Sequence, residues 1–367
     1  MTRTISQDLW RETPRNVFRL DLTAERFAQL QALWRWAVKL GDICRVNYGA
    51  QISSAEPGAF GRDRYLSQSD DGLGDAKRFY EGRDMRPWGM TWNGTWLDWA
   101  AHNDFYGART RSLFENDKLS IRHISGEHDS FVAWVDEDGY YTDHGVIHCV
   151  PYHLVRDEPS YRVHDGRADQ SEPYDLYYLL GILMSRPVLS YYAGLYATGS
   201  LQGAFSHVYP NTVKELPIPQ LDGPPQDAHD DWFERVEAAV GGERYDRGAL
   251  RAAFPSRSEA ISALTAASRR RVALESERAE RNANFGDFMR SRIPDWRWPA
   301  GATLERPPEE VVFLESVGPQ LESVDAVATI RNQFREQTAA AAESDKNAEL
   351  LERGVDVLAD RAFSLAI

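Results

Sequence analysis

The sequence predicts an α+β protein in which short mixed or antiparallel strands surround one buried helix and a helical C-terminal domain follows. Residues 175–185 are apolar nearly all round at helical spacing, and such a segment needs burial on several sides. Between residues 40 and 142, short alternating pieces are separated by turn residues, as in small strands. Beyond residue 226 the chain is rich in Ala, Arg and Glu. We expect three parts: a lead-in and helix over 1–35, an α+β domain over 36–220, and a helical domain over 221–367.

The first elements are predicted from capping and periodicity. Residues 1–23 form an irregular lead-in, and Thr23 is a suitable N-cap for a helix over 24–38. Residues 40–49 then change to short alternation, which predicts a strand that leads into a turn at Gly49.

The middle of the chain predicts further strands. Residues 118–124 alternate with period two, which is typical of a strand. Residues 131–135 and 140–142 predict two more strands, joined by the acidic segment Asp136–Gly139 as a hairpin turn.

Prolines end the buried helix and the domain. Arg186-Pro187 ends or kinks the helix, because proline lacks the N–H that a helix interior needs. A loop of small residues follows over 198–203, and then Pro217 and Pro219 force an extended exit that cannot be a central strand.

The C-terminal part reads as helices. Residues 221–226 form a linker. We expect one helix over 258–293, another that runs from about 308 to 338, and a terminal helix over 339–367.

The composition describes an acidic protein with few lysines. Its 367 residues carry 42 Lys and Arg against 56 Asp and Glu, a formal net charge of -14, and only five residues are lysine. A protein that grips DNA needs cations for phosphate, but a basic groove can lie on an acidic body. We interpret the acidic, lysine-poor surface as halophilic-like adaptation to high salt.

The sequence lacks the features of membrane and secreted proteins. The sequence has no apolar run long enough for a membrane span and no signal-peptide pattern at its start. Two cysteines, Cys44 and Cys149, make no disulfide framework. We therefore expect a cytoplasmic protein that has no membrane contact.

Four ordered motifs resemble one known family. They are residues 40–54 (LGDICRVNYGAQISS), 77–88 (KRFYEGRDMRPW), 118–122 (KLSIR), and 179–192 with 211–219 (LLGILMSRPVLSYY and NTVKELPIP). In this order they resemble the TaqI-like C-terminal specificity domain and, more distantly, the target-recognition domains of type I restriction–modification specificity subunits. Residues 184–187 depart from the pattern, since the family usually has Asn-Ser and a basic residue there.

The resemblance implies a function in DNA recognition. It implies a non-catalytic, sequence-recognising component of a restriction–modification or BREX-like phage-defence system. Its partners would be double-stranded DNA and a DNA methyltransferase, with a nuclease as a further member of the complex. The partner methyltransferase would bind S-adenosylmethionine, and this chain would hold no cofactor. The helical tail would space the domain or dock the partner.

Candidate DNA-contacting residues are the basic and amide side chains near the predicted loops. Arg and Lys suit guanine and phosphate, and Asn and Gln suit adenine. The candidates are Gln51, Ser53, Ser54, Arg62, Arg64, Lys77, Arg78, Arg83, Arg86, Arg122, His123, Ser200, Gln202 and Lys214.

Other clusters are interpreted as structural. His144, His148, Cys149 and His153 lie in a strand or loop pattern that does not converge four ligands, so we expect no metal site. Four tryptophans between residues 88 and 99 are interpreted as packing, and Arg269–Arg271 as a solvated helix face.

Catalytic motifs are missing, but three alternatives remain open. The Pro-Pro pairs at 224 and 307 lack the flanks of an amino-methyltransferase loop, and neither a nucleophile elbow nor a phosphate loop occurs. The chain could be the detached C-terminal part of a fused adenine-N6 DNA methyltransferase. It could be a metal-dependent nuclease that uses Asp136, Asp138 and Asp143, or an acidic inhibitor that mimics DNA.

Overall fold

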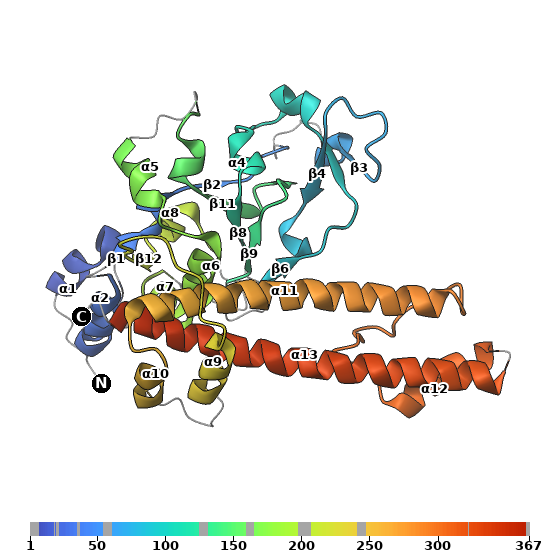
Figure 1. Ribbon diagram of the computed structural model, residues 1–367. Coiled ribbons are helices and arrows are strands. Elements are labelled where there is room, and N and C mark those ends of the chain that lie inside the picture. The colour runs from blue at the N-terminus through green and yellow to red at the C-terminus, as the bar shows by residue number, and fades with distance from the viewer. Residues whose placement is uncertain are drawn as a thin grey trace, which may run out of the picture. The chain divides into compact units, whose positions relative to one another are not determined.

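The computed structural model describes residues 7–17, 19, 22–34, 37–53, 61–124, 131–158, 165–196, 207–240, 247–321 and 323–364. The chain divides into two compact units (Figure 1). Unit 1 comprises Met1–Ser268 with Gly354–Ile367, and unit 2 comprises Arg269–Arg353. Unit 1 combines helices with small mixed sheets, so the α+β prediction is confirmed. The predicted boundaries at 35 and 220 stay a prediction.

The N-terminal helices are α1 (Gln7–Glu12) and α2 (Ala24–Trp34), with the 3-10 turn η1 (Pro14–Asn16) between them. The backbone N–H of Arg26 donates to the Thr23 hydroxyl at 3.1 Å, which confirms the predicted cap. The helix is shorter than the predicted span over 24–38, because Ala37–Lys39 forms the strand β1. The predicted strand over 40–49 begins with a short helix, α3 (Leu40–Ile43), before β2 (Cys44–Tyr48).

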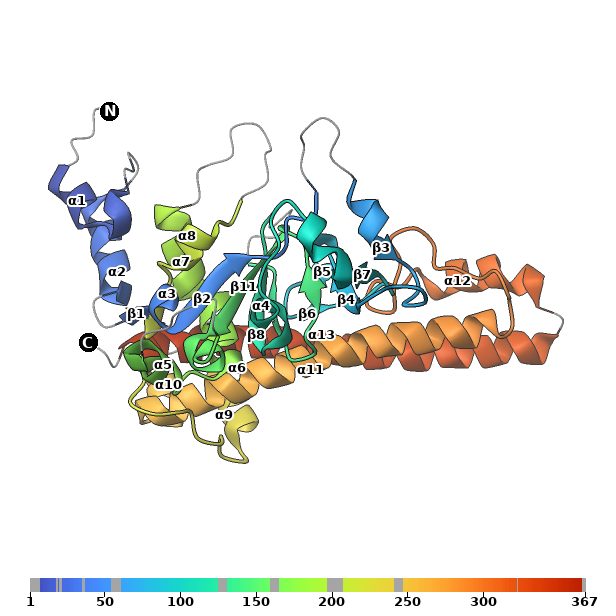
Figure 2. The same ribbon diagram turned by 90° about the horizontal axis from the view of Figure 1, so that it is seen from above.

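The first sheet has the order β2-β11-β8-β9 and is antiparallel throughout. Its other strands are β8 (Lys118–Arg122), β9 (Ala133–Asp136) and β11 (Val146–Pro151). Figure 2 shows β2, β11 and β8 side by side. All six residues of β11 are buried, so both faces of this central strand are covered.

The second sheet has the order β10-β4-β7-β3. It consists of β3 (Leu66–Ser67), β4 (Ala76–Tyr80), β7 (Trp96–Asp98) and β10 (Tyr141–Thr142), and β10 is parallel to β4. A small hairpin joins β5 (Met85–Arg86) to β6 (Gly89–Met90). The short helical segments of this region are η2 (Arg62–Tyr65), η3 (Gly82–Asp84), η4 (Trp99–Asp104), α4 (Ser112–Glu115), η5 (Tyr152–Val155) and α5 (Asp165–Ser171).

The predicted hairpin over 131–142 is wrong. Strands β9 and β10 belong to different sheets, since β9 pairs with β8 and β10 pairs with β4. Asp136 is not a solvated turn residue but the last residue of β9, where it is fully buried opposite Lys118. The acidic segment therefore carries the chain from one sheet to the other.

The predicted buried helix is α6 (Leu176–Met184), and every residue from Tyr178 to Met184 is buried. The Asp175 carboxylate caps its start by accepting from the N–H groups of Tyr177 and Tyr178 at 2.7 and 3.2 Å. The helix ends at Ser185, and α7 (Arg186–Leu195) begins with Pro187 in its first turn, where proline is well tolerated. The prediction that Arg186-Pro187 ends the buried helix is confirmed.

The twin-proline exit is also extended, as predicted. After α8 (Pro210–Val213), Pro217–Pro219 forms β12, which pairs antiparallel with β1 in a sheet of two strands. Such a small sheet tolerates proline because edge strands have backbone groups that need no partner. Two further backbone hydrogen bonds extend the β1–β12 pairing. They run from Leu40 N to Leu216 O and from Gly41 N to Lys214 O, and each is 3.0 Å long.

The C-terminal part is helical, but its helices divide differently from the prediction. They are α9 (Trp232–Val240), α10 (Arg247–Ala253), α11 (Arg257–Arg290), α12 (Glu310–Val317) and α13 (Val324–Ser364), with η6 (Gly318–Gln320) after α12. The break expected near residue 338 is wrong, because α13 continues through it. The chain breaks at Gly318-Pro319 instead, where glycine and proline disfavour a helix interior.

Unit 2 holds an antiparallel pair of helix segments from α11 and α13, the orange and red helices of Figure 1. Arg271 Nε lies 2.8 Å from Glu352 Oε1, and Arg278 pairs with Asp345. Arg271 is only 5% exposed, so the interpretation of Arg269–Arg271 as a solvated face is wrong for this residue. Aromatic rings pack elsewhere in the unit, where Phe313 and Phe334 stack at 4.1 Å.

Among the described helices, none combines the length and the apolar composition that crossing a bilayer requires.

A buried ion pair joins the central strands of unit 1. Lys118 Nζ lies 2.8 Å from Asp136 Oδ2, and both side chains are fully buried. Lys118 also donates to Phe114 O, and Asp136 Oδ1 accepts from Asp138 N at 3.0 Å. Burial lowers the pKa of Lys118 and raises the pKa of Asp136, in each case against the pull of the partner charge. Removing one partner leaves the other as an uncompensated buried charge.

We therefore expect Lys118→Met to lower the free energy of unfolding by about 3–5 kcal/mol, measured by urea denaturation. The double variant Lys118→Met with Asp136→Leu should lose less, because no unpaired charge stays buried. Equal losses in the single and double variants would contradict this account.

Candidate nucleic-acid interface

The turn Asp143–Gly145, between β10 and β11, lies against the end of β2. Gly49 N donates to Val146 O and Ala50 N donates to Thr142 O, both at 2.9 Å. A Cβ atom on Gly49 would lie 2.2 Å from the Thr142 hydroxyl oxygen, so only glycine allows this approach. The predicted glycine turn thus has a physical cause in the packing of two segments that are distant in sequence.

Five of the candidate residues surround this turn, and we call them the turn rim: Gln51, Arg62, Arg83, Arg122 and His123. Gln51 directly follows Ala50, which bridges to Asp143. Arg62 Nη1 lies 3.6 Å from Asp143 Oδ2, and His123 N donates to Gly145 O at 2.9 Å. The turn rim therefore gathers amide, guanidinium and imidazole groups from separate segments of the chain.

Arg83 and Arg122 join the turn rim through Gly82 and Glu81. A Cβ atom on Gly82 would lie 3.0 Å from Gly145 O and 3.3 Å from Cγ of Arg122, so η3 packs directly against the turn. Arg83 Nη2 lies 2.5 Å from Glu81 Oε2, and Arg62 Nη1 contacts Glu81 Oε1. One carboxylate thus holds two of the rim arginines.

A cleft of about 260 Å³ opens beside this carboxylate. Its lining includes Arg62 and Arg83, the buried ring of Phe79, and the amides of Gln68 and Asn93. These are side chains that pair with phosphates and base edges in protein–DNA complexes. The carboxylates Asp63, Glu81 and Asp84 also line it, so the cleft is not uniformly basic.

An aromatic and histidine cluster borders the turn rim at His123. The ring of His123 lies 5.2 Å from Tyr48, 5.0 Å from His207 and 5.4 Å from Tyr209, measured between centroids. Tyr209 is 49% exposed and stacks on His207 at an interplanar angle of 19°. Exposed aromatic faces of this kind can stack on bases.

The His123 side chain is partly buried and is hydrogen-bonded to the backbone. Burial lowers its pKa below the ordinary value, although the hydrogen bond between its Nδ1 and Val208 O, 2.6 Å long, opposes that shift. Sequence reasoning missed the neighbours Tyr48, His207 and Tyr209. A usable signal existed for Tyr48, which stands directly before Gly49 in the first motif.

The remaining described candidates lie outside the turn rim. Arg78 donates to Asp138 O at 2.7 Å and lies 4.4 Å from the Tyr140 ring centroid. Arg64 lies 6.0 Å from the Tyr65 ring centroid, and Arg86 contacts the Thr91 hydroxyl. Lys214 packs at Gly41, at the other end of β2 from Tyr48.

Three candidates lie outside the described residues, and one is next to them. Ser54, Ser200 and Gln202 are outside the part of the chain that the structure describes, while Ser53 is partly buried at its edge. Their proposed DNA contacts stay predictions.

The carboxylates considered for a nuclease do not converge. Asp136 pairs with Lys118, Asp138 lies 3.5 Å from Arg78, and Asp143 is near Arg62. Within the described ranges, no group of three or more His, Cys, Asp or Glu side chains could hold a metal ion. His148, from the sequence cluster of histidines, is buried and bonded to the Ser120 and Thr142 hydroxyls at 3.0 and 2.7 Å.

The tryptophan cluster is largely structural, as predicted. Trp88 and Trp99 are 3% and 1% exposed. Trp92 is partly buried, and its Nε1 donates to Phe79 O and Thr95 O at 3.1 and 3.0 Å.

Together, the small mixed sheets, the buried helix α6 and the extended exit at β12 define an α+β domain. Residues 77–218 match the TaqI-like C-terminal specificity domain. The resemblance found in the sequence motifs is therefore confirmed over these residues. No curated protein matches the chain.

The match covers only part of the turn rim. Arg83, Arg122 and His123 lie inside the matched residues, whereas Gln51 and Arg62 precede them. Strands β1 and β2 also precede the match, but β2 pairs with β11 inside it and β1 pairs with β12 at its end. The folded unit is therefore larger than the matched segment.

A second charged cluster lies on β4 and α4 and on the residues just before each of them. Asp75 accepts from Arg111 Nη2 at 2.5 Å and lies 3.4 Å from Lys77 Nζ, which also lies 3.2 Å from Glu115. Burial of Asp75 and Glu115 would raise their pKa values. For Asp75 the hydrogen bond from Arg111 and the Lys77 charge outweigh burial, and for Glu115 the bonds from Tyr141 and Lys77 do, so both pKa values fall below ordinary.

This cluster predicts a pH dependence of stability. A carboxyl whose pKa is lowered on folding stabilises the protein above its unfolded pKa, about 4, and this stabilisation is lost as the pH falls through the folded pKa. We expect Arg111→Gln to reduce the free energy of unfolding at pH 6, with the difference from wild type narrowing as the pH falls toward 3. Urea denaturation across this range measures it, and a constant difference would contradict the assignment.

Proposed function

We propose that this chain recognises a DNA sequence as the specificity component of a restriction–modification or BREX-like phage-defence system. The observation that carries the proposal is the match of residues 77–218 to the TaqI-like C-terminal specificity domain. A specificity domain of restriction–modification type selects DNA sites, so double-stranded DNA is the proposed ligand.

The chemistry of the turn rim supports this proposal. Gln51 carries the paired donor and acceptor that suit adenine, and the arginines suit guanine or phosphate. His123 with Tyr48, His207 and Tyr209 supplies rings next to these groups. Direct readout and backbone contact would thus come from neighbouring side chains on one part of unit 1.

The proposed catalytic partner is a DNA methyltransferase. In this proposal the partner binds S-adenosylmethionine, flips the target base and transfers the methyl group, while this chain selects the site. The helical C-terminal part offers surfaces for such a partner, because helix docking needs only an amphipathic face. Co-purification followed by a methylation assay on DNA tests this partnership and separates it from a nuclease or a DNA mimic.

Sequence recognition is tested by selection of duplexes from a random DNA library on the purified full chain. We expect an enriched sequence motif. Gln51→Ala should cost about 1–3 kcal/mol of discrimination at one position of the motif, because it removes a base contact. Arg62→Ala should weaken binding to all duplexes and reduce the slope of the salt dependence by about 1. Fluorescence anisotropy at several salt concentrations measures both effects.

The matched control is Arg156→Ala. Arg156 is an exposed arginine that is also paired with carboxylates, Asp169 and Glu172, at 2.6 and 3.0 Å. It lies outside the turn rim, so its replacement should change neither quantity. A library that yields no motif at any salt concentration would overturn the proposed function.

A further inference from the structure

We propose that Glu81 is a built-in substitute for a DNA phosphate, which holds Arg62 and Arg83 ready at the cleft and restrains DNA binding until a phosphate displaces it. This inference rests on the proposed function and adds a restraint on it. It concerns the Arg62–Glu81–Arg83 group, which we call the arginine clamp.

The geometry of the arginine clamp resembles anion binding. Two guanidinium groups from separate segments, η2 and η3, meet on the two oxygens of a single carboxylate, with Arg62 on Oε1 and Arg83 on Oε2. Guanidinium groups bind carboxylate and phosphate through the same fork of N–H donors. A phosphate therefore satisfies the same donors as Glu81 does.

The carboxylate of the arginine clamp is buried and its guanidinium groups are exposed, which favours exchange of the carboxylate for a phosphate. The Glu81 side chain is 11% exposed, whereas Arg62 and Arg83 are 38% and 70% exposed. The carboxylate is thus fixed inside the cleft while the arginines reach solvent. The backbone of Glu81 is held at the start of η3, where its N–H donates to Asp84 Oδ2 at 2.8 Å and its carbonyl oxygen accepts from Asp84 N at 2.9 Å.

The arginine clamp lies next to a cleft, unlike the ion pairs that Lys77 and Arg78 form. Arg62, Glu81 and Arg83 all line the cleft of about 260 Å³. Asp143, at 3.6 Å from Arg62, joins the clamp to the turn rim. An incoming phosphate thus meets the arginines at the same place where base-reading side chains gather.

As a consequence, Glu81 lowers the binding affinity for every duplex by the same factor. A phosphate carries no sequence information, so the carboxylate weakens specific and non-specific binding by the same factor. Sequences that make good base contacts overcome this factor, and others bind too weakly to be occupied. In an acidic protein, such a carboxylate also keeps the exposed arginines paired when DNA is absent.

The test compares the full-length wild type with Glu81→Gln. The glutamine keeps the shape of the side chain and the backbone bonds between residues 81 and 84, but it removes the charge. We expect affinity for an unrelated duplex and for the selected duplex to rise by the same factor, about three- to fivefold, which is the scale of one partly exposed charge pair. The ratio of the two affinities should not change.

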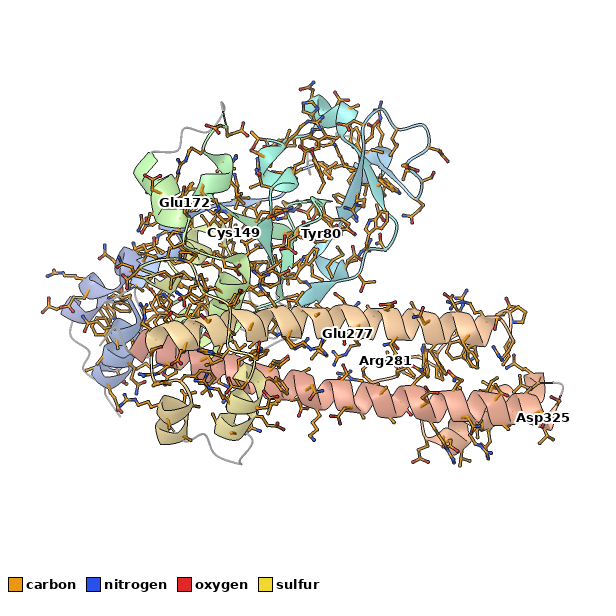
Figure 3. All side chains as sticks on the ribbon, viewed as in Figure 1. Tyr80, Cys149, Glu172, Glu277, Arg281 and Asp325 are labelled. Carbon is orange, nitrogen blue, oxygen red and sulfur yellow. The ribbon has the colours of Figure 1, made fainter. Side chains whose placement is uncertain are left out.

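Two further variants make the test specific. In the Arg62→Met, Arg83→Met background, Glu81→Gln should give no gain, because no guanidinium is left to release. Glu172→Gln is the matched control, since Glu172 also pairs with an arginine, Arg156, at 3.0 Å. Glu172 directly follows α5, and Figure 3 shows it apart from Tyr80, the residue before Glu81. This control should leave affinity unchanged.

Each outcome decides the inference. If Glu81→Gln lowers DNA affinity, or if Glu172→Gln raises it equally, Glu81 is not a phosphate substitute, and the proposed function is unaffected. If the wild type and Glu81→Gln bind the selected duplex equally well, the inference about Glu81 is overturned, and the proposed function still stands. If neither the wild type nor any variant binds DNA, the proposed function fails together with the inference.

Discussion

The pairing of Lys118 with Asp136 is the constraint around which unit 1 is arranged. A lysine and an aspartate that are both fully buried must stay opposite each other, because either charge alone would be costly in the interior. This requirement fixes the register of β8 against β9. Asp136 ends β9 inside the protein, and the next residues, Glu137 and Asp138, are exposed. They cross to the second sheet, and the Asp143–Gly145 turn follows from that crossing.

The charges of the candidate interface are balanced locally. Arg62, Lys77, Arg78 and Arg83 each lie beside at least one carboxylate. Some of the carboxylates that make the chain acidic are therefore paired directly with its basic side chains. A positive surface for DNA would arise by exchange of partners, in which phosphates take the places of carboxylates, and not from an uncovered basic groove.

Sequence reasoning identified the elements whose causes are local. The Thr23 cap, the all-round apolar segment of α6 and the proline exit at 217–219 each depend on residues a few positions apart. The failures depend on distant partners. Asp136 was predicted as a turn residue, but it is buried and paired with Lys118, which lies 18 positions upstream. Arg271 was predicted to be exposed, but it is buried and paired with Glu352 on another helix. The candidate residues could be chosen by chemistry, but not the fact that Glu81 would join Arg62, 19 positions away.

The pairing of β1 with β12 has a consequence for how the domain could change in evolution. Ala37 lies opposite Pro219 in this ladder, so the chain enters and leaves the intervening fold at adjacent points. A segment with neighbouring ends can be replaced by a homologous segment without stretching the flanking polypeptide. If the chain recognises DNA as proposed, recombination between homologous chains at the β1–β12 ladder could therefore exchange the intervening residues, and with them the binding preference, in one step.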